Sequence, residues 1–116
     1  MEKKILVVYV FSKFDEIDRL VNFVEFYKKY ESGIPHTLLI CFKLLDKITL
    51  NKCRNILKSI NYNEYIDEKE INDYEFKTME RAVKVYSDYL ILFLISHCQP
   101  DKKNWLKIIS ESYEEN

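Results

Sequence analysis

The chain of 116 residues contains one glycine, Gly33, and this scarcity excludes whole classes of nucleotide-binding protein. Phosphate-binding loops of the types G-x-G-x-x-G and G-x-x-x-x-G-K-[ST] need several glycines, because their backbone turns tightly and approaches the phosphate closely. The chain therefore has neither the dinucleotide fingerprint of ordinary dehydrogenases nor the P-loop of NTPases.

The sequence also lacks an excess of charge of either sign. Its 18 basic and 19 acidic residues leave a formal net charge of -1. Proteins that bind a nucleic-acid backbone without a sequence motif depend on clustered Lys and Arg, which attract the phosphates. We therefore do not expect a nucleic acid as partner.

Paired cysteines and long apolar runs are absent as well. Cys41, Cys53 and Cys98 form no C-x-x-C pair and no Cys/His spacing of a zinc site, so we expect reduced, mostly buried thiols and no resident metal. No run approaches the ~18 apolar residues of a membrane span, and the short N-terminal apolar stretch lacks the cleavage site of a signal peptide. These features favour a cytoplasmic protein without a membrane span.

What the sequence does contain is apolar material for one core, since 47% of its residues are hydrophobic and 15% are aromatic. Residues 4–11, 36–43 and 89–95 are almost continuously apolar, as strands covered on both faces are, and residues 62–67 form a shorter candidate strand. Apolar residues at spacings of three and four predict helices between and after these strands, over residues 14–30, 50–60, 76–86 and 101–113.

The alternation of strands and amphipathic helices defines the expected fold class. Buried strands that alternate with helices indicate a parallel sheet with helices on both faces, joined by right-handed crossovers. We therefore predict a single α/β domain over residues 1–116, a three-layer αβα Rossmann-like half domain with a mainly parallel four-stranded sheet.

Candidate ligand-binding residues lie where the predicted strands end, because ligands of open α/β sheets bind beyond the carboxyl ends of the strands. The first strand ends in Phe11-Ser12, and the fourth ends in Ser96-His97-Cys98. A histidine in that place could bind a metal, transfer a proton or donate to a phosphate, although polar residues also end strands for structural reasons alone.

Two segments carry a family resemblance. The first is FSKFDEIDRLVNFVEFYKKYESGIPHTLLICFK, in which a G-I-x-H-x-L segment leads into a strand that finishes in Phe-Lys; the second is FLISHCQPDKKNWL. Together they resemble bacterial glycosyltransferase-like proteins related to the family-2 transferases of GT-A fold. The matching positions are Gly33, Ile34, His36, Leu38, Phe42, Lys43, Phe93, Leu94, Ser96, Trp105 and Leu106.

The resemblance implies the N-terminal, donor-binding half of such a transferase, with a nucleoside diphosphate sugar as ligand and Mg or Mn as its companion ion. In this family the end of the first strand holds the base, and the start of the third helix holds the base or ribose. An arginine of that helix reaches the pyrophosphate, and the end of the fourth strand lies beside the sugar. The positions for the base are Tyr9 and Phe11, and the position for the base or ribose is Asp73. Arg81 is the position that reaches the pyrophosphate, and Ser96 and His97 lie beside the sugar.

The sequence departs from the family at the Asp-x-Asp motif, whose positions are Ile95 and His97 here. One imidazole does not replace two carboxylates in holding the metal that offsets the charge of a diphosphate leaving group. A glycine of the family is also replaced, by Leu44. Because no acceptor-binding half follows in the sequence, we expect an incomplete domain without catalytic residues, inactive alone.

An alternative is a non-catalytic interaction or oligomerisation domain that kept the fold, binding a second copy or a partner subunit. Phe23 and Phe26 lie beyond the apolar stripe of the first helix, and Tyr62 and Tyr65 lie in the third strand. These side chains would supply the surface aromatics that interfaces favour. A receiver-like signalling domain is the weakest of the alternatives, because the acidic cluster that would hold magnesium after the first strand is missing.

Overall fold

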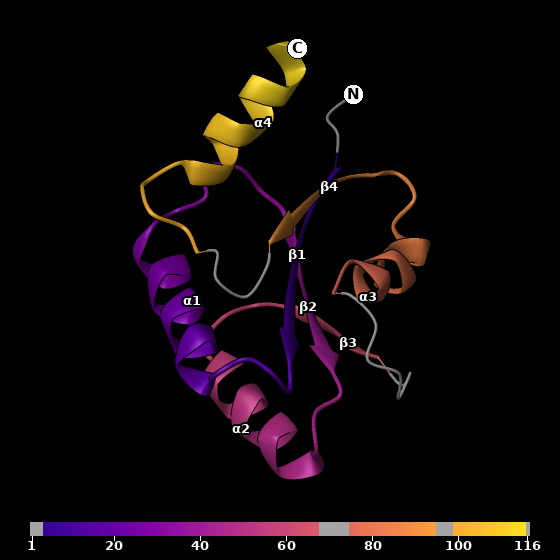
Figure 1. Cartoon of the computed structure of the whole chain (residues 1–116). Coiled ribbons are helices and arrows are strands. Elements are labelled where there is room, and N and C mark those ends of the chain that lie inside the picture. Colours follow the sequence, from indigo (N-terminus) through magenta and orange to yellow (C-terminus); the bar gives the residue numbers. More distant parts are fainter. Residues whose placement is uncertain (1–3, 68–74, 95–98, 116) are drawn as a thin grey trace.

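A computed structural model describes residues 4–67, 75–94 and 99–115 of the chain (Figure 1). Strands and helices alternate along these residues as the sequence predicts. In chain order the elements are β1 (Lys4–Ser12), α1 (Ile17–Lys29), β2 (Thr37–Lys43), α2 (Lys47–Leu57), β3 (Asn63–Asp67), α3 (Glu75–Ala82), the 3-10 turn η1 (Val83–Val85), β4 (Tyr89–Leu94) and α4 (Trp105–Glu115).

The four strands form one sheet in the order β3-β2-β1-β4, and every neighbouring pair is parallel. β1 lies in the middle, with β2 on one side and β4 on the other. Its residues from Ile5 to Ser12 are all buried, which explains why this strand is apolar on both faces. The predicted α/β class with a parallel four-stranded sheet is confirmed.

Helices cover both faces of the sheet, as Figure 1 shows, with α1, α2 and α4 on one face and α3 on the other. Alternate side chains of β1 divide between the two layers. Tyr9 and Phe11 belong to the larger core under α1, α2 and α4, whereas Val8 and Val10 belong to the smaller core under α3, with Met79. The structure is therefore a three-layer αβα arrangement around a central sheet.

The start of α1 differs from the prediction. The spacing of apolar residues predicts a helix over residues 14–30, whereas α1 begins at Ile17, after a turn. The Ser12 amide donates to Asp15 Oδ2 at 2.8 Å, so the pair closes this turn rather than the helix. As a consequence Phe14, expected on the apolar stripe of the helix, lies outside it and is 63% exposed.

The loop between α1 and β2 holds the beginning of α4. The Asn104 amide donates to the Glu31 carbonyl at 2.7 Å, and the Trp105 indole donates to the Tyr30 carbonyl at 3.2 Å. Gly33, at φ 83°, has the left-handed conformation that glycine adopts without strain. These contacts join two segments that lie about seventy residues apart in sequence, and they place α4 on the same face as α1.

Candidate functional site

Polar side chains lie in register at the carboxyl ends of three strands. Ser12 of β1 pairs with Lys43 of β2, and Lys43 pairs with Asp67 of β3. All three are buried, and Lys43 is only 1% exposed. Because alternate residues of a strand point to opposite faces, these three point toward α3, as their neighbours in the smaller core do.

The buried charge of Lys43 is satisfied by a network with α3. Its Nζ donates to Thr78 Oγ1 at 2.9 Å, and it lies 3.5 Å from Asp67 Oδ2. The Thr78 hydroxyl in turn donates to Asp67 Oδ2 at 2.6 Å. A buried ammonium is tolerated only when it is paired and hydrogen-bonded in this way.

Arg81 completes the network from the next turn of α3. Its Nε donates to Asp67 Oδ1 at 3.2 Å, and its Nη2 binds Oδ2 of the same carboxylate. Arg81 was predicted to reach a pyrophosphate; the structure places its guanidinium on Asp67, with 20% of the side chain exposed. We therefore assign this cluster of Lys43, Asp67, Thr78 and Arg81 a structural role, that of holding α3 at the carboxyl edge of the sheet.

The turn after β1 places an aromatic ring and a lysine at this same edge. The Lys13 amide donates to the Lys43 carbonyl at 3.1 Å, and the Phe14 amide donates to Ser12 Oγ at 3.3 Å. Lys13 Nζ lies 5.2 Å from the centre of the Phe14 ring, and both side chains are exposed. Sequence reasoning missed this pair because the spacing of Phe14 fits the helical stripe; the short Ser12-to-Asp15 turn was the available signal.

The turn after β2 contains a strained backbone. Leu44 has φ 60°, in the left-handed region that glycine favours. For a residue with a Cβ this conformation costs about 1–2 kcal/mol. The neighbouring Asp46 caps α2 by accepting from the Thr49 amide at 2.7 Å. The turn thus keeps a backbone shape that its sequence disfavours.

Tyr9 and Phe11, the predicted base-binding residues, are 0% and 1% exposed. The Tyr9 ring stacks on Phe23 with ring centres 4.2 Å apart, inside the larger core. In this structure both side chains are part of the larger core and are not accessible to a ligand at the carboxyl edge. Phe23 is itself fully buried, so its expected place among surface aromatics is wrong. Asp73, Ser96 and His97 lie outside the described residues, as does Cys98.

Two buried cysteine thiols have raised pKa values and are therefore unreactive near neutral pH. Cys41 and Cys53 are free and buried. Burial, with a smaller contribution from the charge of Asp67, raises the pKa of the Cys41 thiol to about 12. Burial alone raises the pKa of the Cys53 thiol to about 11. Because the thiolate is the nucleophile, neither residue is suited to catalysis near neutral pH.

No family model, curated protein or solved structure matches this chain. In the part of the chain that the structure describes, no three His, Cys, Asp or Glu side chains gather into a group that could hold a metal ion. None of the helices within those residues has the length and apolar composition needed to cross a bilayer. The fold and the geometry of the carboxyl edge are therefore the basis for an assignment of function.

Proposed function

We propose that this domain binds a nucleoside diphosphate sugar at the carboxyl edge of its sheet, beside the end of β1. The observation that carries the proposal is the all-parallel strand order β3-β2-β1-β4. The chain continues from β1 to β2 on one side, whereas β4 lies on the other side of β1. Ligands of open α/β sheets bind at such a switch point, outside the carboxyl ends of the two strands.

Side chains at this edge suit the two chemical parts of the ligand. The exposed Phe14 ring offers a face for the base, and the adjacent Lys13 ammonium offers a charge for the diphosphate. The left-handed backbone of Leu44 is one that glycine, which the resembled family has at this position, adopts without strain. Asp73, Ser96 and His97, which the resemblance names, stay further candidates for contacts with the ligand.

The proposal concerns binding of the nucleotide sugar and not transfer of its sugar to an acceptor. In the resembled family a divalent ion is seated by Asp-x-Asp, and here the corresponding positions are Ile95 and His97. Mg or Mn would therefore arrive mainly as a companion of the diphosphate, whose oxygens are the hard ligands that these ions prefer. We expect manganese to strengthen binding of a diphosphate more than binding of the free nucleoside.

The experiment is a calorimetric titration of the protein with UDP, GDP and their sugar conjugates, with and without manganese. We expect a dissociation constant of about 0.1–1 mM for at least one ligand. Replacement Phe14→Ala should weaken binding at least about fivefold, since stacking on an aromatic ring contributes roughly 1–3 kcal/mol per base.

The matched control is Val85→Ala, which also truncates an exposed apolar side chain but lies in η1, before the start of β4 and therefore away from the carboxyl edge. This variant should bind like the wild type. Absence of heat with every nucleotide would refute the proposal. Equal binding by wild type and Phe14→Ala would show that the base does not use this ring.

A further inference from the structure

The outer side of β4 is an apolar strand edge. Within residues 4–67, 75–94 and 99–115, β4 pairs only with β1, and Figure 1 shows it at the border of the sheet. Its sequence, YLILFL, contains no charge, proline or glycine. The opposite border, β3, is shorter and carries Glu64, which pairs with Arg54. Charges and short strands protect edges from pairing with other chains, and among the described residues this protection is seen at the β3 border and not at β4.

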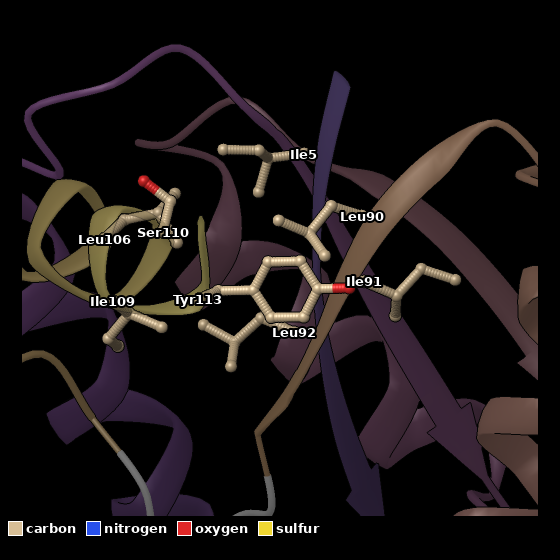
Figure 2. Close-up of a pocket in the computed structure, with 8 residues that line it drawn as sticks. All are labelled: Ile5, Leu90, Ile91, Leu92, Leu106, Ile109, Ser110 and Tyr113. Carbon is tan, nitrogen blue, oxygen red and sulfur yellow. The ribbon is translucent and has the colours of Figure 1, made fainter. Parts of the chain in front are cut away.

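An apolar groove of about 110 Å³ runs beside this edge, between β4 and α4 (Figure 2). Leu90 and Leu92 line it from the face of the sheet that α4 covers, whereas Ile91 points to the other face. The groove therefore reaches the outer side of the strand. Tyr113 extends from α4 toward β4 in Figure 2 and is 56% exposed. The remaining lining residues are Ile5, Leu106, Ile109 and Ser110.

We propose that β4 pairs with β4 of a second copy of this chain, antiparallel and across a two-fold axis perpendicular to the sheet. The two four-stranded sheets then become one continuous sheet, and the groove of each copy is closed by the other. The surface involved, β4 together with the exposed side of α4, is called the β4 edge below. It is distinct from the carboxyl edge, so the nucleotide proposal and this one can fail separately.

The symmetry of the proposed dimer favours a second copy of the chain as the partner that pairs with β4. A two-fold axis perpendicular to the sheet keeps each face on its own side, so a residue can pair only with one on the same face of the partner strand. With Leu92 on the axis, Leu92 meets its own copy, Leu90 meets Leu94, and Ile91 meets Phe93. Every cross-strand pair is then apolar, which is the favourable kind for neighbouring strands.

The available area is that of a weak dimer. Phe93 and Tyr113 are 45% and 56% exposed, and Ile108 and Ile109 are 45% and 43% exposed. Since an aromatic side chain presents roughly 150–250 Å², the two aromatics would bury on the order of 200 Å² per copy. The isoleucines, the strand edge and the groove add to this, toward the ~600 Å² per partner of the smaller specific interfaces. We expect a dissociation constant of about 10–100 µM.

The test is sedimentation velocity of the full chain from about 5 to about 500 µM, compared with a variant that places a charge at the β4 edge. Phe93 is suitable because its side chain is half exposed and belongs to neither core cluster. Replacement Phe93→Lys should weaken the dimer at least about tenfold, because like charges from the two copies lie close to the axis. Amide exchange of β4 should slow with protein concentration in the wild type only.

Val85→Lys is the matched control, since it charges an exposed apolar position away from β4 and should leave association unchanged. Tyr113→Lys is the second variant should Phe93→Lys fail to fold, and it should weaken the dimer as well. A wild type that stays monomeric at about 500 µM overturns the proposal, and so does a dimer that neither variant weakens. Slow exchange, in a strict monomer, of those β4 amides that point away from β1 would also overturn it, and would assign the edge to another segment of the chain.

Discussion

Lys43 is the residue whose surroundings matter most for the stability of the site. Its ammonium is buried at the end of β2 and lies 2.9 Å from Thr78 Oγ1 and 3.5 Å from Asp67 Oδ2. Arg81 binds the same carboxylate. Among the residues that the structure describes, the Asp67 carboxylate thus contacts two cations from different elements. Replacement of Asp67 removes a carboxylate that contacts the buried Lys43 ammonium, which is more costly than loss of an exposed pair.

We expect Asp67→Asn to lower the free energy of unfolding by about 3–5 kcal/mol, measured by urea denaturation. Glu64→Gln is the matched control in the same strand. It removes an ion pair with Arg54 whose side chains are 41% and 32% exposed, so its cost should stay below about 1 kcal/mol. Similar losses for the two variants would show that the Asp67 network contributes no more than a surface ion pair.

At this scale the sequence predicted where polar residues would lie but not their partners. Lys43 and Arg81 were both noted, one at a strand end and one on the third helix. Their meeting at Asp67 depends on how α3 packs across β2 and β3, which residue spacing along the chain does not encode. Phe14 shows the reverse case, since its spacing fits a helix but a hydrogen-bonded turn places it in solvent.

Among the helices, α4 is notable because its beginning packs tightly against a loop distant in sequence. Its beginning rests on the loop that contains Gly33, and a Cβ at this glycine would lie 2.5 Å from Asn104 Oδ1 and 3.0 Å from Asn104 Cα. Asn104 itself has φ 63°, so two left-handed residues face each other where the loop meets the helix. This close approach explains why the only glycine of the chain lies in this loop.

We expect Gly33→Ala to destabilise the protein by about 2–4 kcal/mol, from the strain of the positive φ and from overlap with Asn104. The double variant Gly33→Ala/Asn104→Gly should recover at least about 1 kcal/mol of this, because it removes the Asn104 side chain and relieves the strain at that residue. Urea denaturation of both variants measures the difference. Full additivity of the two single substitutions would exclude a direct contact.

The order of the elements followed from the sequence, whereas their ends did not. Strands and helices of the predicted type occur in the predicted order, because continuous apolar runs and spacings of three and four distinguish the two. α1 begins later than predicted, at Ile17, and α4 begins at Trp105 rather than near residue 101. Ends depend on hydrogen bonds with distant segments, such as that between Asn104 and Glu31.

For the molecule as a whole, two buried thiols make the free energy of unfolding decrease at alkaline pH. The ordinary thiol pKa is 9.0, and the folded protein raises it to about 12 for Cys41 and about 11 for Cys53. The folded state therefore holds these protons more tightly than the unfolded chain does. The corresponding stability is complete below pH 9 and is lost as the pH rises from 9 through the folded values.

We expect the free energy of unfolding to fall between pH 7.5 and pH 10 by about 2–3 kcal/mol more in the wild type than in the double variant Cys41→Val/Cys53→Ala. The comparison removes the effect of other groups that titrate in this range, and a reductant keeps the thiols from oxidising. Urea midpoints at the two pH values provide the measurement. Parallel pH profiles for the two proteins would mean that the thiols ionise in the folded state as readily as in the unfolded chain.

The sequence by itself determined the class of fold, because the periodicity of apolar residues is a local property that each segment carries alone. Its single glycine likewise excluded phosphate loops, since these loops need several glycines close together in sequence. Tertiary structure decided which side chains are available for function. It buried Tyr9 and Phe11 under α1, paired Arg81 with Asp67, and left Phe93 exposed on β4. Exposure and pairing arise from contacts between segments distant in sequence, and only the packed chain brings those segments together.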